Sequence, residues 1–171
     1  RTLPTNSAEE QKILLLTLLL NLYPVVWAQT CSDTIFVTAP DSRYRDNSDG
    51  TITDLQSGLI WKQCSQGLSG SDCSSGAVET KTWQQALQAA DTEQFAGYDD
   101  WRLPNLSELA SLVEMSCYSP AINDNYFPNT ENSYYWSSSP YASYSAYAWS
   151  VGFDYGSDYR DYKDSDLYVR L

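Results

Sequence analysis

The sequence predicts a single α+β domain held together by two disulfides. Segments with strand character come first, two amphipathic helices follow, and strands return at the C-terminal end, without βαβ alternation. Four cysteines follow an apolar N-terminal run, which indicates a chain that meets an oxidising compartment. The 171 residues suffice for one packed domain, because 42% are hydrophobic and 14 Tyr and 6 Trp are among them.

Composition excludes several classes of function. The chain has no histidine, which removes Ser-His-Asp triads, Cys-His pairs and imidazole metal ligands. It has 10 basic against 22 acidic side chains and a formal net charge of -12. A nucleic-acid partner is not expected, since phosphate contacts need clustered Lys and Arg. We also expect no cofactor and no metal.

The N-terminal residues have the pattern of an export signal. Residues 13–28 are predominantly apolar, and this run is shorter than the roughly 20 residues that a membrane-spanning helix needs. It ends in Val-Trp-Ala, which places small residues where a signal peptidase requires them. We therefore expect a signal-peptide region at 1–28 and an exported domain at 29–171. A buried or membrane-anchoring helix is the alternative, and the helix breaker Pro24 argues against it.

The four cysteines are even in number, as expected for a disulfide framework, and the sequence alone allows three pairings. Cys64 and Cys73 flank a short Gly- and Ser-rich loop that closes easily, so we expect them to pair. The other expected pair, Cys31 with Cys117, would tie the start of the exported domain to its middle. A metal site is the alternative, but the chain has neither C-x-x-C nor His.

Short strands and turns are predicted in the first part of the domain. The strand-prone segments 42–45 and 51–53 flank residues 46–50, where Asp, Asn, Ser and Gly favour a turn. Another strand begins in 58–61. The run DNSDGTITD also resembles a calcium-binding loop, but Arg45 and Gln56 would then occupy the first and twelfth ligand positions. A hairpin turn is therefore the prediction.

Two amphipathic helices are predicted in the middle of the chain. In 82–96, behind a Thr82 cap, apolar residues recur with helical spacing at Trp83, Ala86, Leu87 and Ala90. In 105–115, Asn105 and Glu108 can form a variant of the capping box. The apolar face of this second helix consists of Leu106, Leu109 and Val113. Both helices are expected to cover the core.

Three strands are predicted near the C-terminal end, over 134–138, 146–153 and 167–171. Alternation along the middle strand places one set of side chains together: Tyr147, Trp149, Val151 and Phe153. The opposite set is Ala148, Ser150, Gly152 and Asp154. We expect the first face to pack and the second to be free to meet a partner.

Residues 141–168 have an unusual composition, because seventeen of these twenty-eight residues are Tyr, Ser or Asp. Antibody paratopes favour Tyr and Ser, since Tyr gives rigid amphipathic contact area and Ser gives adaptable hydrogen bonds. Tyr, Ser and Asp are also all reached from the Asn codon AAC by changing adenines. This composition predicts a variable recognition surface. An acidic, solvated loop without a selected partner is the alternative.

Six ordered segments resemble a known family. They are DNSDGTITDLQSGLIWK (46–62), FAGYDDWRLPNLSEL (95–109), SCYSPAINDNYFPNT (116–130), YWSSS (135–139), AWSVGF (148–153) and VRL (169–171). With them the chain resembles the bacterial domain family named after the C-terminal domain of the Legionella collagen-like adhesin. Within that family it is similar to the variable target proteins of diversity-generating retroelements. The resemblance covers residues 41–171.

The resemblance implies a C-type-lectin-like fold related to the formylglycine-generating-enzyme domain, with two helices packed on short antiparallel sheets. It implies a fixed scaffold that includes Trp101, Arg102, Leu103, Pro104, Trp136, Trp149, Phe153, Val169 and Arg170. Variable, ligand-binding positions are implied on an exposed C-terminal sheet and loop. On this chain they are Ser143, Tyr144, Ser150, Asp154, Tyr155, Ser157, Asp158, Tyr159, Arg160, Asp161, Tyr162, Asp164, Ser165 and Asp166.

These observations predict an exported binding protein that recognises an extracellular protein or other macromolecule. The alternative is a cell-surface adhesin or lectin for neutral glycans, since the negative charge would repel anionic ones. Catalysis is not expected. A formylglycine-type oxidase needs a reactive cysteine pair, whereas these cysteines have the spacing of structural ones, and the carboxylates of Asp99 and Asp100 fit a turn.

Overall fold

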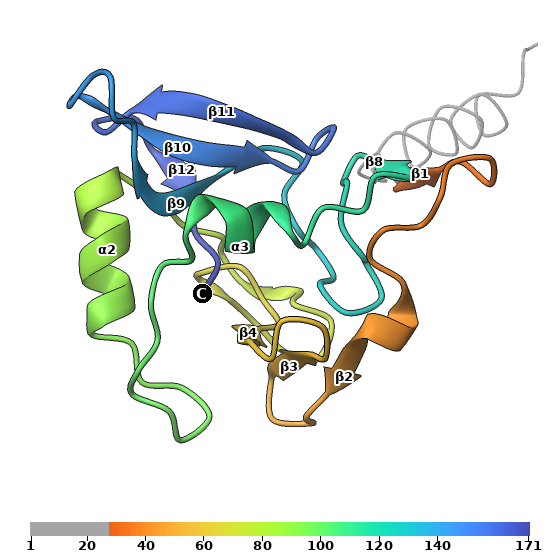
Figure 1. Cartoon of the computed structure of the whole chain (residues 1–171). Coiled ribbons are helices and arrows are strands. Elements are labelled where there is room, and N and C mark those ends of the chain that lie inside the picture. The colour runs from red at the N-terminus through yellow and green to blue at the C-terminus, as the bar shows by residue number, and fades with distance from the viewer. Residues whose placement is uncertain (1–27) are drawn as a thin grey trace, which may run out of the picture.

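The computed structural model describes residues 28–171, in which two α-helices pack against the five-stranded β-sheet and further small sheets lie beside them (Figure 1). The predicted signal-peptide region, except for its last residue, lies outside the described residues. Strands dominate, with the two helices in the middle of the sequence and two disulfides near its sheets. This architecture is compatible with the predicted α+β class.

The largest sheet has five strands in the order β11-β10-β9-β12-β7. Its strands are β7 (Thr80–Lys81), β9 (Tyr134–Pro140), β10 (Tyr147–Gly152), β11 (Ser157–Tyr162) and β12 (Leu167–Tyr168). Neighbours are antiparallel except β12 and β9, which are parallel. The three predicted C-terminal strands are present as β9, β10 and β12. The fourth, β11, was not predicted, and it pairs with β10 from Tyr147↔Tyr162 to Gly152↔Ser157.

A three-stranded sheet at the other end of the domain contains the predicted hairpin (Figure 1). It consists of β2 (Tyr44–Asp46), β3 (Thr51–Asp54) and β4 (Ile60–Lys62), after the 3-10 helix η1 (Asp41–Arg43). In the connecting turn the Asp46 and Asp49 carboxylates accept hydrogen bonds from the Ser48 and Thr51 amides. Gly50 has φ +85°, which only glycine adopts readily. The hairpin prediction is confirmed.

Both predicted helix starts are confirmed, but both helices end earlier than predicted. Helix α2 (Trp83–Asp91) begins with a capping box between Thr82 and Gln85. It ends five residues before 96: the Glu93 amide bonds to the Ala90 carbonyl three residues back, and a turn with positive φ at Ala96 and Gly97 follows.

Helix α3 (Leu106–Ala110) begins with the predicted capping box between Asn105 and Glu108. After Ala110 the chain tightens, so that the amides of Leu112 and Val113 bond to carbonyls three residues back. Val113 then pairs with Ile122 in an isolated β-bridge. The apolar spacing up to Val113 therefore continues past the true helix end.

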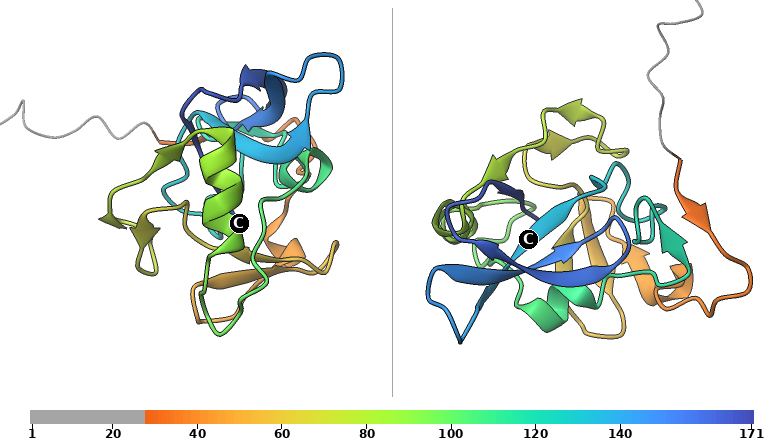
Figure 2. Two further views of the ribbon diagram at one scale, coloured as in Figure 1. Left: turned by 90° about the vertical axis from the view of Figure 1, so that its left-hand side faces the viewer. Right: turned by 90° about the horizontal axis from the view of Figure 1, so that it is seen from above.

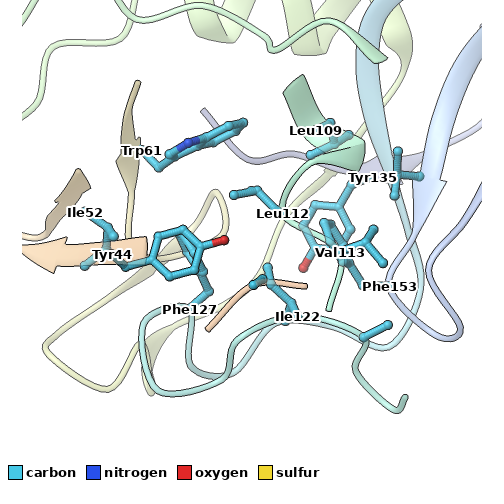
Figure 3. Packing of buried hydrophobic residues seen from close by; sticks show 13 residues of the cluster. Tyr44, Ile52, Trp61, Leu109, Leu112, Val113, Ile122, Phe127, Tyr135 and Phe153 are labelled. Atoms are coloured by element: carbon cyan, nitrogen blue, oxygen red, sulfur yellow. The ribbon is translucent and has the colours of Figure 1, made fainter. Parts of the chain in front are cut away.

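The core has two clusters that lie against the five-stranded sheet. One joins the three-stranded sheet and α3 to Tyr135 and Val151, and Figure 3 shows its close packing. The other joins α2 to Trp136 and Ala148 (Figure 2, left). Since Tyr135 and Trp136 are successive residues of β9, their side chains point to opposite faces. The two helices therefore pack on side chains from opposite faces of that strand.

Two small sheets and the two disulfides complete the domain. Strands β1 (Thr30–Cys31) and β8 (Cys117–Tyr118) form one sheet, and β5 (Leu68–Ser69) and β6 (Ser75–Gly76) form the other. The bonds Cys31–Cys117 and Cys64–Cys73 are both present, so the expected pairing is confirmed. The first closes directly across the β1–β8 ladder.

Candidate binding surface

The β10–β11 hairpin holds most of the predicted ligand-binding residues, and it is fixed to the core at its turn. Phe153 is fully buried, and its carbonyl accepts a 2.6 Å hydrogen bond from the Ala121 amide. At Gly156, with φ +77°, an added Cβ would lie 2.4 Å from Cγ1 of Val113. The turn is therefore pressed against the chain that follows α3, which gives the exposed strand a rigid base.

The hairpin separates the predicted residues onto two faces. In the register of β10 and β11, Asp158, Arg160 and Tyr162 lie opposite Val151, Trp149 and Tyr147. The alternate residues Ser157, Tyr159 and Asp161 lie opposite Gly152, Ser150 and Ala148, and so point the other way. A single ligand on one face would therefore touch about half of the set.

On the first face five aromatic rings form a continuous group, named here the aromatic cluster: Tyr141, Tyr144, Tyr147, Trp149 and Tyr162. The Tyr147 and Tyr162 centroids are 4.2 Å apart, and those of Tyr141 and Trp149 are 5.1 Å apart. The Arg160 guanidinium lies 5.3 Å from the centroid of Tyr141. The neighbouring Tyr162 phenol raises the pKa of Tyr147.

The structure corrects the predicted roles of the two faces of β10. Tyr147 and Trp149, expected to pack in the core, are half-buried in the aromatic cluster. Ala148, Ser150 and Gly152, expected to be free, are buried. The physical reason is that α2 and Trp136 cover Ala148 in the second core cluster. Phe153 and Val151 do pack, as predicted.

Ser150 is the one predicted ligand-binding residue that is fully buried. Its hydroxyl donates a 2.5 Å hydrogen bond to the Asp161 carboxylate on the neighbouring strand. It therefore supports the surface from beneath and does not contact a ligand there.

On the same face Tyr159 pairs with Tyr134 at 5.8 Å between centroids. Burial, with the nearby Asp154 and Asp161 carboxylates, raises the pKa of Tyr134.

The remaining predicted residues lie at the ends of the hairpin. Asp154 and Tyr155 are in the β10–β11 turn, where the Tyr155 ring stacks on that of Tyr118 at 6.0 Å. Ser143 is in the exposed loop between β9 and β10. Three more follow β11 in the loop that leads to β12: Asp164, Ser165 and Asp166.

Four tyrosines of the predicted set are more than half exposed. Their exposed fractions are 65% for Tyr144, 70% for Tyr155, 55% for Tyr159 and 58% for Tyr162. All four lie on the β10–β11 hairpin or on the loop that leads into it. They offer aromatic area to the solvent that the fold itself does not use.

The charge of this surface is negative. Its carboxylates are those of Asp154, Asp158, Asp161, Asp164 and Asp166, and none takes part in the ion pairs of the described residues. The two cations of this segment lie over rings: Arg160 over Tyr141, and Lys163 at 4.3 Å over Trp83. A cationic partner would therefore meet carboxylates without a competing cation bonded to them.

A buried arginine holds the chain end beneath this surface. The Arg170 guanidinium donates to the carbonyls of Lys62 and Gln63 and to the hydroxyls of Ser65 and Thr130. It also lies over the rings of Phe127 and Tyr135, and burial lowers its pKa. These contacts join β4 and the loop after it to the end of the five-stranded sheet.

Several surface residues were missed by sequence reasoning. Tyr141, Tyr147 and Trp149 complete the aromatic cluster, and Tyr118 and Tyr134 back the exposed Tyr155 and Tyr159. The Tyr-rich composition could have included Tyr141 and Tyr147. Strict alternation instead assigned Tyr147 and Trp149 to the core.

A comparison with family models decides which family these residues represent. The model of the Lcl C-terminal domain matches residues 50–171. The chain belongs to this family. No curated protein and no solved structure matches the chain. The matched part of this Lcl C-terminal domain contains both helices, the five-stranded sheet and the entire β10–β11 hairpin.

The described residues before position 50 extend the Lcl C-terminal domain at its N-terminal side. They contribute β1, η1 and β2, held by the Cys31–Cys117 bond and by an ion pair of 2.5 Å between Arg43 and Asp54. Nothing between residues 28 and 171 forms a helix long and apolar enough to cross a membrane. In the same range, no three His, Cys, Asp or Glu residues are grouped so that they could hold a metal ion.

Proposed function

We propose that this chain is an exported binding domain, without catalytic activity, whose Tyr-, Ser- and Asp-rich C-terminal surface recognises an extracellular protein or other macromolecule. The observation that carries this proposal is the aromatic cluster, in which Tyr144 and Tyr162 are exposed, beside a hairpin with a buried base. Export is supported by the two disulfides, which persist in oxidising compartments.

The physical basis of recognition is the low entropic cost of ordering tyrosines on a rigid strand. Tyr has few rotatable bonds, and rings that already contact one another lose little freedom when a partner covers them. Tyr and Trp are also the residues that most often dominate binding energy. The carboxylates around the cluster would favour partners with basic side chains and speed their approach at low salt.

The proposal includes a C-type-lectin-like fold and diversification of this surface by a retroelement. The burial of the implied variable positions supports diversification, because thirteen of the fourteen are not buried, Ser150 being the exception. Substitution at such positions leaves stability within about 0.5 kcal/mol. The surface can therefore change while the scaffold remains folded.

A binding role is favoured over catalysis by the state of the reactive groups. All four cysteines are in disulfides, so the thiols that a formylglycine-type oxidase needs are not free. The Glu108 carboxylate accepts from the Arg102 guanidinium and from the Asn105 amide, which lower its pKa and keep it ionised. It acts as a helix cap and not as a proton donor.

The alternative is a lectin for neutral glycans that uses the same rings. Aromatic rings can stack on sugars, so the aromatic cluster favours a lectin, and the negative charge repels anionic glycans. The experiment below distinguishes the protein-binding role from the lectin role, because it applies one purified domain to an array of proteins and to an array of glycans.

The test replaces the four exposed tyrosines together: Tyr144→Ser, Tyr155→Ser, Tyr159→Ser and Tyr162→Ser. Purified protein and variant are applied to an array of extracellular proteins and to a glycan array. We expect protein partners that the variant no longer binds, with Tyr98→Ser, partly exposed on a distant loop, as the matched control. Unchanged partner choice in the variant would overturn the proposal, and binding confined to glycans would favour the lectin.

A further inference from the structure

The outer edge of the five-stranded sheet has unpaired backbone groups. β11 is an end strand of this sheet, and no strand within residues 28–171 pairs with its outer side (Figure 1; Figure 2, right). It is six residues long, and all of them but Asp161 are exposed. A free edge of this length can pair with another extended chain.

The register shows which backbone groups face outward. The Lys163 amide donates to the Ala146 carbonyl, so this directly opposed pair is a hydrogen-bonded one. Because such pairs alternate along an antiparallel ladder, Ser157, Tyr159 and Asp161 turn their amides and carbonyls toward β10. Those of Asp158, Arg160 and Tyr162 point away from the sheet.

Five of these six outward groups have no partner in the described chain. The Tyr162 carbonyl accepts from the Ser165 amide at 2.8 Å. The amides of Asp158, Arg160 and Tyr162 and the carbonyls of Asp158 and Arg160 remain. They form a row along one edge, at the spacing that a β-strand requires.

The side chains beside this row match an extended peptide with basic residues. A strand added to β11 would place alternate side chains next to Arg160 and Tyr162 on one face and next to Tyr159 and Asp161 on the other. Five Asp against Arg160 and Lys163 line the segment 154–166, so Lys or Arg on the added strand would be attracted. A second copy is disfavoured by the net charge of -12 on each chain.

We infer that β11 binds its partner by strand addition, and that the partner is an extended, basic segment of a protein. This inference rests on the proposed function and specifies the partner of the same surface. Main-chain hydrogen bonds would supply affinity that does not depend on side chains, while the exposed tyrosines and carboxylates would select the sequence. Variation of the side chains would then change partner choice without removing the common binding mode.

The probe is a phage-displayed library of random linear peptides, panned on the purified protein. We expect selected peptides to lack Pro and to alternate β-branched with Lys or Arg residues. In hydrogen exchange with one synthetic selected peptide, the amides of Asp158, Arg160 and Tyr162 should change from fast to protected. Those of Ser157 and Tyr159 should be protected with and without peptide.

Matched variants isolate the backbone. Asp158→Pro removes an outward amide, while Asp158→Ala removes only the carboxylate. Pro is tolerated at an edge where the amide faces solvent. Loss of one hydrogen bond should weaken binding in the Pro variant about threefold to tenfold relative to the Ala variant. N-methylation of the peptide at alternate residues tests the same bond from the other side, with the protein unaltered.

Three outcomes would overturn the inference. One is that no peptide is selected. Another is that Pro substitution and N-methylation leave affinity unchanged while the four-tyrosine variant loses it, in which case the proposed function stands and strand addition falls. The last is a dimer in sedimentation that Asp158→Pro abolishes, because the occupant would then be a second copy. If the unaltered protein bound no protein on the array, the proposed function itself would fall.

Discussion

Trp136 of β9 and Tyr159 of β11 belong to one sheet with only β10 between them, yet one is fully buried and the other is 55% exposed. Trp136 is covered by α2, and its indole donates to the Lys81 carbonyl. Tyr159 touches only Tyr134 among the aromatic residues. The position of a strand in the sheet thus decides whether an aromatic side chain serves the core or the surface.

Two arginines show the same contrast. Arg170 is buried and makes four hydrogen bonds to two segments of the chain, residues 62–65 and Thr130. Arg160 is exposed and lies over the Tyr141 ring. Removing the first leaves buried acceptors without a donor, whereas water can replace the second. The same residue type therefore stabilises the fold at one site and shapes a recognition surface at the other.

The largest expected effect is on the buried base of the hairpin. Phe153→Ala should lower the free energy of unfolding by about 3 to 5 kcal/mol, since it leaves a cavity beside Tyr135. Urea denaturation measures this, with Tyr155→Ala, two residues away and exposed, as the control. Equal losses in the two variants would show that the turn has no buried anchor.

Arg170→Met should lower the free energy of unfolding by about 3 kcal/mol, because the side chain keeps its bulk but the four acceptors lose their donor. Arg160→Met is the matched control and should change it by less than about 0.5 kcal/mol. A loss in the control as large as that in Arg170→Met would contradict the contrast between the two sites.

Ser150 tests the boundary between surface and scaffold. Ser150→Tyr inserts a ring where the side chain is fully buried, so we expect a loss of about 1 to 3 kcal/mol in thermal or urea unfolding. Ser157→Tyr on the neighbouring exposed strand should be almost neutral. If Ser150→Tyr were tolerated equally well, Ser150 would belong with the variable surface after all.

Acid should weaken the scaffold through the buried Asp54 carboxylate. Burial by itself raises the pKa of Asp54, but hydrogen bonds from Arg43, Ser57 and the Gln56 amide outweigh it and lower the pKa to about 2. Because the folded pKa lies below the ordinary 3.8, this stabilisation is present above pH 4 and is lost as the pH falls toward 2. Urea midpoints measured across this range should fall, and less steeply in Asp54→Asn.

Sequence reasoning predicted the elements whose signals are local. The caps Thr82 and Asn105, the turn before β3 and the Cys64–Cys73 disulfide follow from residue types at short spacing, and the Cys31–Cys117 disulfide is the pair that then remains. It failed where tertiary contacts decide. No apolar alternation marks β11, which is recognised as a strand only by its pairing with β10. Helix α3 ends before Val113, which pairs with Ile122 in place of continuing the helix.

The candidate surface was also predicted only in part, because its composition is a local signal and its arrangement depends on tertiary contacts. Composition identified the exposed tyrosines, because a Tyr- and Asp-rich segment cannot build a core. Alternation could not show that α2 covers Ala148 and leaves Trp149 half-exposed, since that depends on a helix some sixty residues away in sequence. The split of the site into two faces likewise requires the hairpin register.

The smallest expected effect on stability is also the most informative about function. Tyr144→Ser and Tyr159→Ser each remove an exposed ring, from opposite faces of the hairpin, and each should change the free energy of unfolding by less than about 0.5 kcal/mol. If a partner covers the aromatic cluster alone, Tyr144→Ser should weaken its binding and Tyr159→Ser should not. Strand addition at β11 reaches both faces, so there both variants should weaken binding. Titration calorimetry of the two variants with one selected partner distinguishes these cases, and a loss of stability in either variant would contradict the separation of scaffold from surface.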